Sequence, residues 1–333
     1  MNPPSQVVQC SNPDCKIAET GTCVEGLDRS VCGNFGRPLR ALDDAPDAED
    51  DAAREMVSLP HADRLKPYEA RDLLPRARGH VIAIVGPHDS GKTSLIASLY
   101  DQLQDGPIGP FAFRSSQTLH AFEKACHDAR IASQRGTPHS ERTKRGEVRF
   151  FHLGLLASEP LNLLLGDRAG EEYREAGDDT TLAAEFIEVK RADVVTLLVD
   201  GKRLAHDGHR HNAREEMLLI LQALNDAEIV PKGVRLAIVL TKIDAVRASP
   251  NAKRVEADLA TVVARLSAHF ADRFAKVEVF CVAASPTDPG VDRGTGIPEL
   301  LRFWLEDASP AAQVNPAQGV SERVIARLTE VGV

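Results

Sequence analysis

The feature that most constrains this chain is a glycine-rich loop, Gly86-Pro-His-Asp-Ser-Gly-Lys-Thr93, directly after the apolar run Val81–Val85. The spacing G-x4-G-K-T between a strand and a helix is typical of a phosphate-binding loop. Its glycines permit a tight turn in which successive backbone N–H groups point at phosphate oxygens, and the following helix adds its partial positive charge. We therefore predict an α/β fold with a phosphate site at the end of its first buried strand.

Within this loop, Lys92 is expected to bring a point charge to the outer phosphates, and Thr93 a hydroxyl to a Mg²⁺ ion. The alternative, a glycine-rich turn that binds nothing, is disfavoured by the strand before the loop and the helix after it. The other loop residues predicted to bind a nucleotide are Gly86, His88, Asp89, Ser90, Gly91 and Ser94.

Apolar runs alternate with helix-like segments from residue 80 onward, which favours a mostly parallel sheet covered on both faces. About five helices are expected, the first from Thr93 to about Leu103 and the last from Ile297 to Leu305. The six predicted strands are 81–85, 147–155, 161–165, 192–200, 234–240 and 277–283.

A second motif, Asp167-Arg-Ala-Gly170, follows the apolar strand that begins at Leu161. Asp167 is expected to hold Mg²⁺ through a water molecule, in the role that phosphate-loop proteins give to this position. Gly170 can donate its backbone N–H to a γ-phosphate because it has no side chain to prevent close approach. On its own such a motif is usually a turn, so its value here comes from its position after the strand.

A third motif, Thr241-Lys-Ile-Asp244, follows the apolar run Val234–Leu240. The Asp244 carboxylate can accept hydrogen bonds from the N1–H and 2-amino groups of guanine, a pair of donors that adenine lacks. The stem of Lys242 can cover the face of the base, and Ala284 would bring a backbone N–H near the guanine oxygen. The alternative is a surface turn after a core strand.

Taken together, these motifs resemble those of a translation-factor-related (TRAFAC), Ras-like P-loop GTPase over residues of about 80 to 306. The resemblance implies an enzyme that binds GTP and Mg²⁺ and hydrolyses GTP to GDP and phosphate, with threonine replacing the usual asparagine at Thr241. The cysteine-rich start followed by such a G domain is similar to bacterial double-GTPase proteins of conflict or defence systems. The implied role is that of a molecular switch.

The resemblance also implies a threonine in the first switch that meets Mg²⁺ and the γ-phosphate; Thr143 is the first candidate and Thr137 the alternative. Glu171 stands where Ras-like proteins carry the glutamine that orients water. It could still position water, but it keeps open a second function, a GTP-binding scaffold with little hydrolysis. Arg142 is a candidate arginine finger acting in cis. A solvated basic loop is the favoured alternative for the segment around Arg142.

Four cysteines in the first 32 residues, Cys10, Cys15, Cys23 and Cys32, could close a structural zinc site. Their spacing is not the paired Cys-x-x-Cys pattern, and unrelated reduced cysteines are the alternative. The predicted organisation is a zinc module at 1–36, an acidic and proline-containing linker at 37–79, a G domain at 80–308 with an inserted helical segment near 105–143, and a tail at 309–333.

The net charge of −9 argues against nucleic-acid binding through a global positive field, and no apolar run is long enough to span a bilayer. We therefore expect a cytoplasmic protein with no membrane partner. Protein partners are expected through the switch segments, the inserted helix and the zinc module, while the pattern leaves the oligomeric state open. An ATPase is disfavoured by Asp244.

Overall fold

The computed structural model of the protein describes residues 62–129, 146, 148–288 and 290–306, together with Ile17, Asp28, Ser30 and Phe35. The chain divides into two compact units, Met1–Leu59 and Pro60–Val333. All of the helices and strands whose bounds are given below belong to the second unit.

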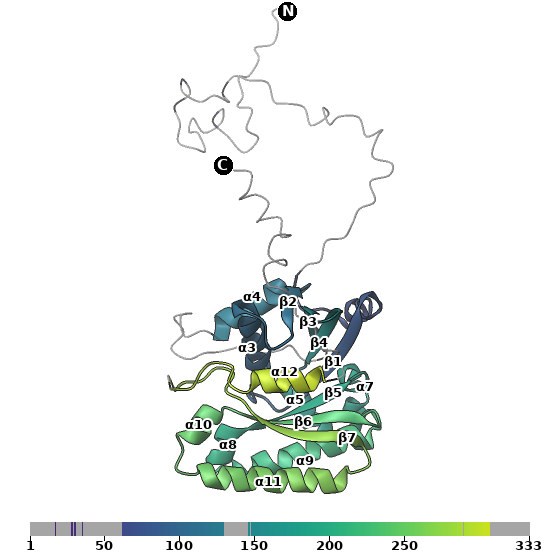
Figure 1. The fold of residues 1–333 in the computed structure, drawn as a ribbon, viewed down its shortest axis with the longest axis vertical. Coiled ribbons are helices and arrows are strands. Elements are labelled where there is room, and N and C mark those ends of the chain that lie inside the picture. The colour runs from purple at the N-terminus through teal and green to yellow at the C-terminus, as the bar shows by residue number, and fades with distance from the viewer. Residues whose placement is uncertain are drawn as a thin grey trace, which may run out of the picture. The chain divides into compact units, whose positions relative to one another are not determined.

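A seven-stranded sheet with the order β2-β3-β4-β1-β5-β6-β7 forms the centre of this unit (Figure 1). β1 pairs in parallel with β4 and β5, and β6 pairs in parallel with β5 and β7. β3 is antiparallel to both of its neighbours, β2 and β4. The strands are β1 (Arg78–Val85), β2 (Ala112–Ser115), β3 (Arg149–Leu156), β4 (Pro160–Asp167), β5 (Val194–Asp200), β6 (Val234–Thr241) and β7 (Phe274–Cys281).

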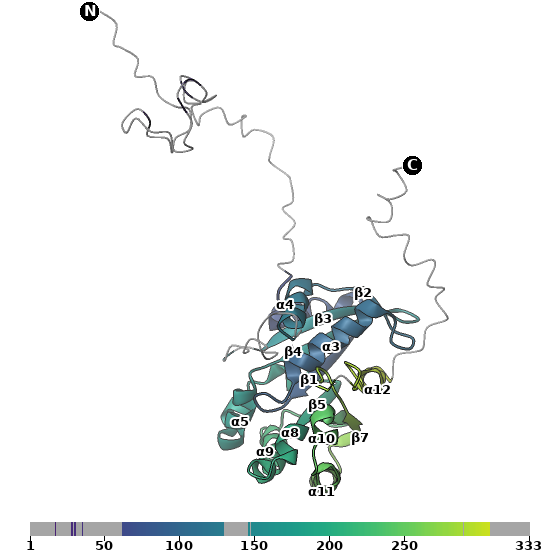
Figure 2. The same cartoon turned by 90° about the vertical axis from the view of Figure 1, so that its left-hand side faces the viewer.

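Helices cover both faces of the sheet (Figure 2). Ile82 and Ile84 of β1 pack in the same apolar cluster as α3, α4 and α12, whereas Ala83 and Val85 pack with α5, α9 and α11. This alternation follows from the period of two along a strand, so a strand buried on both faces is apolar throughout. The longer helices are α3 (Lys92–Asp105), α4 (Leu119–Ala129), α5 (Gly170–Asp178), α9 (Arg210–Asp226), α11 (Ala252–His269) and α12 (Ile297–Trp304).

Short helices complete this unit: α2 (Pro67–Arg71), η1 (Leu74–Arg76), α6 (Thr180–Ala183), α7 (Ile187–Lys190), α8 (Gly201–Ala205) and α10 (Ile243–Arg247). Among the described residues, no helix is long and apolar enough to cross a bilayer.

The prediction of six strands was wrong by one, because β2 lies in the segment predicted as a helical insertion. β2 has four residues, is partly exposed, and pairs with β3 through an irregular register between Phe113 and Ser115. A short edge strand with arginine and serine at its end lacks the apolar alternation by which the other strands are predicted. The helix expected in the same segment is present as α4.

Residues 62–79, within the predicted linker, pack on the sheet. Leu65 forms an antiparallel bridge with Phe150, with both N···O distances 2.9 Å. Leu65 and Leu73 are buried in a third apolar cluster, and the amide of Asn162 donates to the main-chain oxygen of Leu73 at 2.9 Å. The few leucines of this segment bury enough apolar surface to dock it on the sheet.

Candidate nucleotide-binding site

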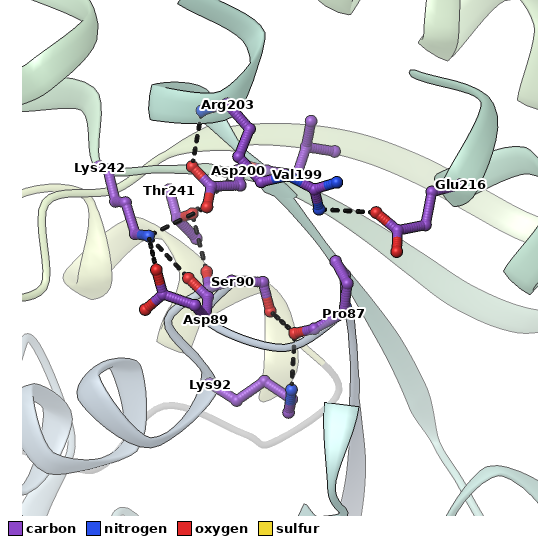
Figure 3. A network of polar contacts seen from close by, with 10 residues as sticks. All are labelled: Pro87, Asp89, Ser90, Lys92, Val199, Asp200, Arg203, Glu216, Thr241 and Lys242. Carbon is purple, nitrogen blue, oxygen red and sulfur yellow. Dashed lines mark hydrogen bonds and ion pairs between the residues drawn. The ribbon is translucent and has the colours of Figure 1, made fainter. Parts of the chain in front are cut away.

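The first and third motifs meet at the carboxyl ends of the strands (Figure 3), and the second motif begins at the end of β4, the neighbour of β1. The phosphate loop connects β1 to α3, and the neighbouring strands end at Asp167, Asp200 and Thr241. In parallel sheets the carboxyl ends of adjacent strands lie side by side, and ligands bind in the crevice that their loops form. The topology therefore brings together predicted binding residues that are far apart in sequence, such as Ser90 and Thr241, which are 151 positions apart.

The phosphate loop holds a conformation with two left-handed residues, Asp89 at φ 59° and Gly91 at φ 96°. The hydroxyl of Ser90 donates to the main-chain oxygen of Pro87 at 2.8 Å, which closes the turn from inside. A Cβ atom on Gly86 would lie 2.7 Å from Ser90 Oγ and 3.1 Å from Leu198 Cβ, so a side chain there would force neighbouring atoms to move. The loop is thus compact and exposes main chain.

Lys92, the first residue of α3, is 8% exposed and points back into the loop. Its Nζ donates to the main-chain oxygens of Gly86 at 2.9 Å and Pro87 at 3.0 Å. Burial lowers the pKa of Lys92 to about 8, against the opposing charges of Asp167 and Asp89. An anion beside Nζ would favour the charged form and raise this pKa, as expected for a phosphate-binding lysine.

Asp167 ends β4 with its side chain fully buried, and its Oδ2 accepts a hydrogen bond from Arg64 Nη1 at 2.7 Å. Because the Asp167 carboxylate influences the pKa of Lys92, it lies within electrostatic reach of the phosphate loop. Thr93, half-buried in the first turn of α3, provides a hydroxyl on the same loop. Such a set of hard oxygen ligands fits Mg²⁺, which binds through few protein oxygens together with phosphates and water.

Gly170 begins α5 with its backbone directly against the phosphate loop. A Cβ atom at this position would lie 2.4 Å from the main-chain nitrogen of His88 and 2.4 Å from the carbonyl carbon of Pro87. The position thus has no room for a side chain. Glu171, the next residue, lies half-buried in the first turn of α5.

The third motif is bonded to the first. Thr241 Oγ1 donates to the main-chain oxygen of Ser90 at 2.8 Å and to that of Val199 at 3.3 Å. Lys242, in a left-handed conformation, donates through Nζ to the main-chain oxygen of Asp89 at 2.7 Å and to Asp200 Oδ2 at 3.0 Å. The stem of Lys242 was predicted to cover the base; the hydrogen bonds of its ammonium group to Asp89 and Asp200 were not predicted.

Asp200 itself was missed by the sequence analysis, although a carboxylate at the end of β5 is a signal that could have found it. Its Oδ1 accepts from the backbone N–H of Arg203 at 3.0 Å and caps α8, while its Oδ2 accepts from Lys242. One carboxylate therefore fixes both a helix start and the lysine of the third motif.

Asp244 lies at the other end of the site and is 5% exposed. Its Oδ2 accepts hydrogen bonds from the backbone N–H and the hydroxyl of Thr287, at 3.0 and 3.3 Å. Thr287 belongs to the loop that follows β7, which also contains the half-buried Ala284. Ala284 in this loop was predicted from the sequence, but Thr287, the residue that orients the carboxylate, was not.

Arg168, inside the second motif, is bound away from Asp167. It donates to Glu188 through Nε at 2.6 Å and Nη2 at 3.1 Å, and the Tyr173 hydroxyl donates to the same carboxylate at 3.0 Å. Burial opposes the charge of Arg168, but the hydrogen bonds and charge of Glu188 outweigh it, so the pKa of Arg168 is raised. Nothing in the sequence around Glu188 indicated this role.

A neighbouring carboxylate extends the contacts of the second motif. Glu172 Oε1 accepts from the backbone N–H of Gly146 at 2.7 Å, so α5 is hydrogen-bonded to a residue three positions before β3. The predicted first-switch threonines Thr143 and Thr137, Arg142, and the four cysteines Cys10, Cys15, Cys23 and Cys32 lie outside the described residues. In the described part of the chain, no group of three or more His, Cys, Asp or Glu side chains is suited to hold a metal ion.

The remaining predicted residues fall on the phosphate loop and α3. His88 and Asp89 are exposed, Ser90 is buried, and Ser94 is half-buried. The described residues that the sequence predicted for the site lie at the ends of β4 and β6, on the loops that follow β1, β4, β6 and β7, or in the first turn of the helix after each loop.

No curated protein sequence matches the chain significantly. Among solved structures, the chain is similar to the signal recognition particle receptor SRb-GTP/SRX complex from Chaetomium thermophilum, with 15% identity and a TM-score of 0.38 over 68% of this chain and 95% of that chain. The model of the Double-GTPase 2 family matches residues 80–305, a range that contains all three motifs. This chain therefore belongs to the double-GTPase 2 family of P-loop GTPases.

Proposed function

We propose that this protein is a GTP-dependent molecular switch that binds GTP with Mg²⁺ and hydrolyses it to GDP and phosphate. The observation that carries the proposal is the joining of the three motifs: Thr241 and Lys242 are bonded to the phosphate loop, and Gly170 packs on it. A loop that touches the phosphate loop through a glycine backbone can respond to whether a γ-phosphate is present.

In this proposal the phosphate end works by charge and main-chain hydrogen bonds. Lys92 turns its ammonium group from the carbonyls of Gly86 and Pro87 to the outer phosphates, and Gly170 donates its backbone N–H to the γ-phosphate. Thr93 and Asp167 would hold Mg²⁺, which when bound neutralises charge on the phosphates. Thr143 is proposed as a third residue that would hold Mg²⁺.

Hydrolysis is proposed to be an in-line displacement. The oxygen of a water molecule bonds to the γ-phosphorus as the bond to the bridging oxygen breaks, and the proton of the water leaves with the phosphate. Glu171, at the start of α5, is the residue proposed to orient that water. Arg142 is the proposed arginine finger, supported by its place in the basic segment before β3.

Base selectivity is assigned to Asp244. Its carboxylate is buried and held by Thr287, so binding adenine would leave it facing a base without the matching donors. Asp244→Asn should weaken GTP binding and favour the xanthine nucleotide, because the amide presents a donor where xanthine has an oxygen. Binding of GTP, ATP and XTP to both proteins measures this. An unchanged preference for GTP would remove Asp244 from the role.

The second candidate function is a GTP-binding scaffold with little hydrolysis, and Glu171 in the position of the usual glutamine favours it. A single-turnover experiment separates the two: purified protein is loaded with GTP, and the bound nucleotide is analysed over time. Conversion to GDP supports the enzyme, and persistence of GTP supports the scaffold. Lys92→Ala, which should fail to load, is the negative control, and Glu171→Gln tests whether an amide accelerates the reaction.

The parts outside the described residues complete the proposal. Cys10, Cys15, Cys23 and Cys32 are proposed as a structural zinc site, and metal analysis of reduced, purified protein tests it. A defence or conflict role is supported by the resemblance of this cysteine-rich start and G domain to such bacterial proteins. Capture of proteins that bind the form loaded with a nonhydrolysable GTP analogue, compared with the GDP form, tests for switch-dependent partners.

A further inference from the structure

Arg64 belongs to the segment before β1, outside all three motifs, and its main chain is held firmly in place. The next residue, Leu65, exchanges two hydrogen bonds of 2.9 Å with Phe150 and is 4% exposed. Lys66 is the N-cap residue of α2, and its backbone N–H donates to Glu69 Oε2 at 2.7 Å. The backbone hydrogen bonds of the next two residues, Leu65 and Lys66, therefore hold the Cα atom of Arg64 in position.

From this anchor the guanidinium reaches the end of β4. Nη1 of Arg64 lies 2.7 Å from Oδ2 of Asp167, and its Cζ lies 6.0 Å from the centre of the Phe151 ring. The Asp167 side chain is 0% exposed and that of Arg64 is 27% exposed. Such a pair is strongly charge-assisted, because the carboxylate has lost its contact with water and the arginine supplies the compensating charge.

The arginine nearest to Asp167 in sequence does not form an ion pair with it. Arg168 follows Asp167 directly, yet its guanidinium is bonded to Glu188 and Glu172. The ion pair of Asp167 with Arg64 is thus a long-range contact between residues separated by 103 positions, and it joins the segment before the sheet to the proposed magnesium site.

The same carboxylate is the one proposed to hold Mg²⁺. A guanidinium and a divalent cation both gain from the negative charge of Asp167, and each repels the other when they are close. The ion pair with Arg64 therefore opposes metal binding at Asp167. The repulsion is weakly screened, since the carboxylate is buried.

We propose that Arg64 is a positioning residue of the magnesium site: as the counter-ion of Asp167, it must give way to Mg²⁺ and so sets the metal concentration at which the nucleotide complex closes. The inference rests on the proposed function, since it assumes that Asp167 serves a nucleotide-bound Mg²⁺. It makes the segment before the G domain part of the site.

The test measures how the retention of a fluorescent GDP analogue depends on Mg²⁺ in the full-length chain. For Arg64→Gln, the half-saturating Mg²⁺ concentration should fall about tenfold, because an adjacent arginine lowers the affinity of a carboxylate for a proton by about tenfold or more and should weaken Mg²⁺ binding in the same sense. Arg64→Lys keeps the charge on a more flexible stem and should lie between Arg64→Gln and the wild type. Thermal melting without ligand checks that each variant is folded.

Arg265→Gln is the matched control. Arg265 forms a bidentate pair with Glu215 at 2.7 and 3.2 Å, but both residues are exposed on the helices α9 and α11. Its loss should leave the Mg²⁺ dependence unchanged. If Arg64→Gln does not fold, an unchanged Mg²⁺ requirement in Arg64→Lys overturns the inference.

The outcomes separate this inference from the proposed function. A wild-type protein that retains no guanine nucleotide at any Mg²⁺ concentration refutes the proposed function. Wild-type retention together with an equal or higher Mg²⁺ requirement in Arg64→Gln refutes the role of Arg64 alone. Slower hydrolysis of GTP by Arg64→Gln at saturating Mg²⁺, with an unchanged half-saturating concentration, would overturn the inference and place Arg64 on the phosphates.

Discussion

The phosphate end of the site and its base end are built by different means. At the phosphate end the contacts are made by main chain and by buried charge: Gly170 touches Pro87 and His88 through its backbone, and Lys92 is buried against carbonyl oxygens. At the base end the Asp244 carboxylate is held by the backbone N–H and the hydroxyl of Thr287.

The difference shows which part of the site can vary. Close contact between backbones leaves no space for an added atom, so the phosphate end should respond steeply to a single methyl group. The contact between the Asp244 carboxylate and the Thr287 hydroxyl is long, at 3.3 Å, so its loss should cost no more than about 1 kcal/mol and leaves the path of the chain intact. The base end should therefore respond to substitution in smaller steps. Three predictions follow this contrast, in order of expected effect.

Gly170→Ala should give the largest effect. Its Cβ would lie 2.4 Å from backbone atoms of Pro87 and His88, so either the phosphate loop or α5 must move. We expect a loss of about 1–3 kcal/mol in the free energy of unfolding, measured by denaturant titration, and loss of the preference for GTP over GDP. Gly177→Ala in the same helix is the control, because its Cβ would be 3.8 Å from Leu219, an ordinary contact. Equal stability of the two variants would break the comparison.

The second prediction concerns pH and Lys92. Its pKa in the folded protein is lowered to about 8, below its ordinary value of 10.5. The free site therefore loses its positive charge as pH rises through 8, while bound phosphates favour the charged form. From pH 7.0 to 8.5 the affinity for GDP, measured in EDTA, should fall about fourfold, with uptake of a proton on binding.

Lys92→Arg controls for this pH effect, because arginine stays charged over the whole range. Its GDP affinity should be nearly independent of pH between 7.0 and 8.5, whatever its absolute value. A pH dependence as steep as that of the wild type would assign the effect to another group. The lowered pKa also means that Lys92 contributes to folding stability in the opposite sense to an ion-paired lysine: stability rises between pH 8 and 10.5.

Thr287→Ala should give the smallest effect. It removes the hydroxyl contact of 3.3 Å to Asp244 but leaves the backbone N–H at 3.0 Å. The affinity for GTP should fall about threefold, which corresponds to less than 1 kcal/mol. Thr287→Ser keeps the hydroxyl and should bind like the wild type. A loss of GTP affinity of about tenfold or more in Thr287→Ala would show that the base end is as sensitive to substitution as the phosphate end, against the contrast drawn above.

Much of the fold could be predicted because local pattern and local structure agree. The apolar run at 81–85 lies within β1, and the helix predicted from Thr93 to about Leu103 is α3. The helix predicted within the insertion is α4, in which Phe122 and Cys126 are buried while Leu119 is exposed. β2 and the short helices could not be predicted in this way, because four or five residues carry too little periodicity and their stability comes from neighbours that are distant in sequence.

The site residues likewise fall into those that the local sequence predicts and those that only tertiary contacts reveal. Lys92, Asp167, Gly170 and Asp244 could be selected because their types and spacing suit phosphate, magnesium and guanine, and each follows a strand. Glu188, Thr287 and Arg64 have no local signature, and the only local signal for Asp200 is its place at the end of β5. They were identified by contacts with residues 42 to 103 positions away, or 15 to 20 for Glu188.

The sequence by itself determined the ligand chemistry and the α/β class, because glycines, a lysine and carboxylates at strand ends have intrinsic geometry and charge. Tertiary structure alone decided which charges are paired and which backbones touch. Because Asp167 is buried, its ion pair with Arg64 is only weakly screened by solvent. Because Gly170 packs on the phosphate loop, a single methyl group at that position would collide with backbone atoms. Both arise because the sheet brings distant strand ends together.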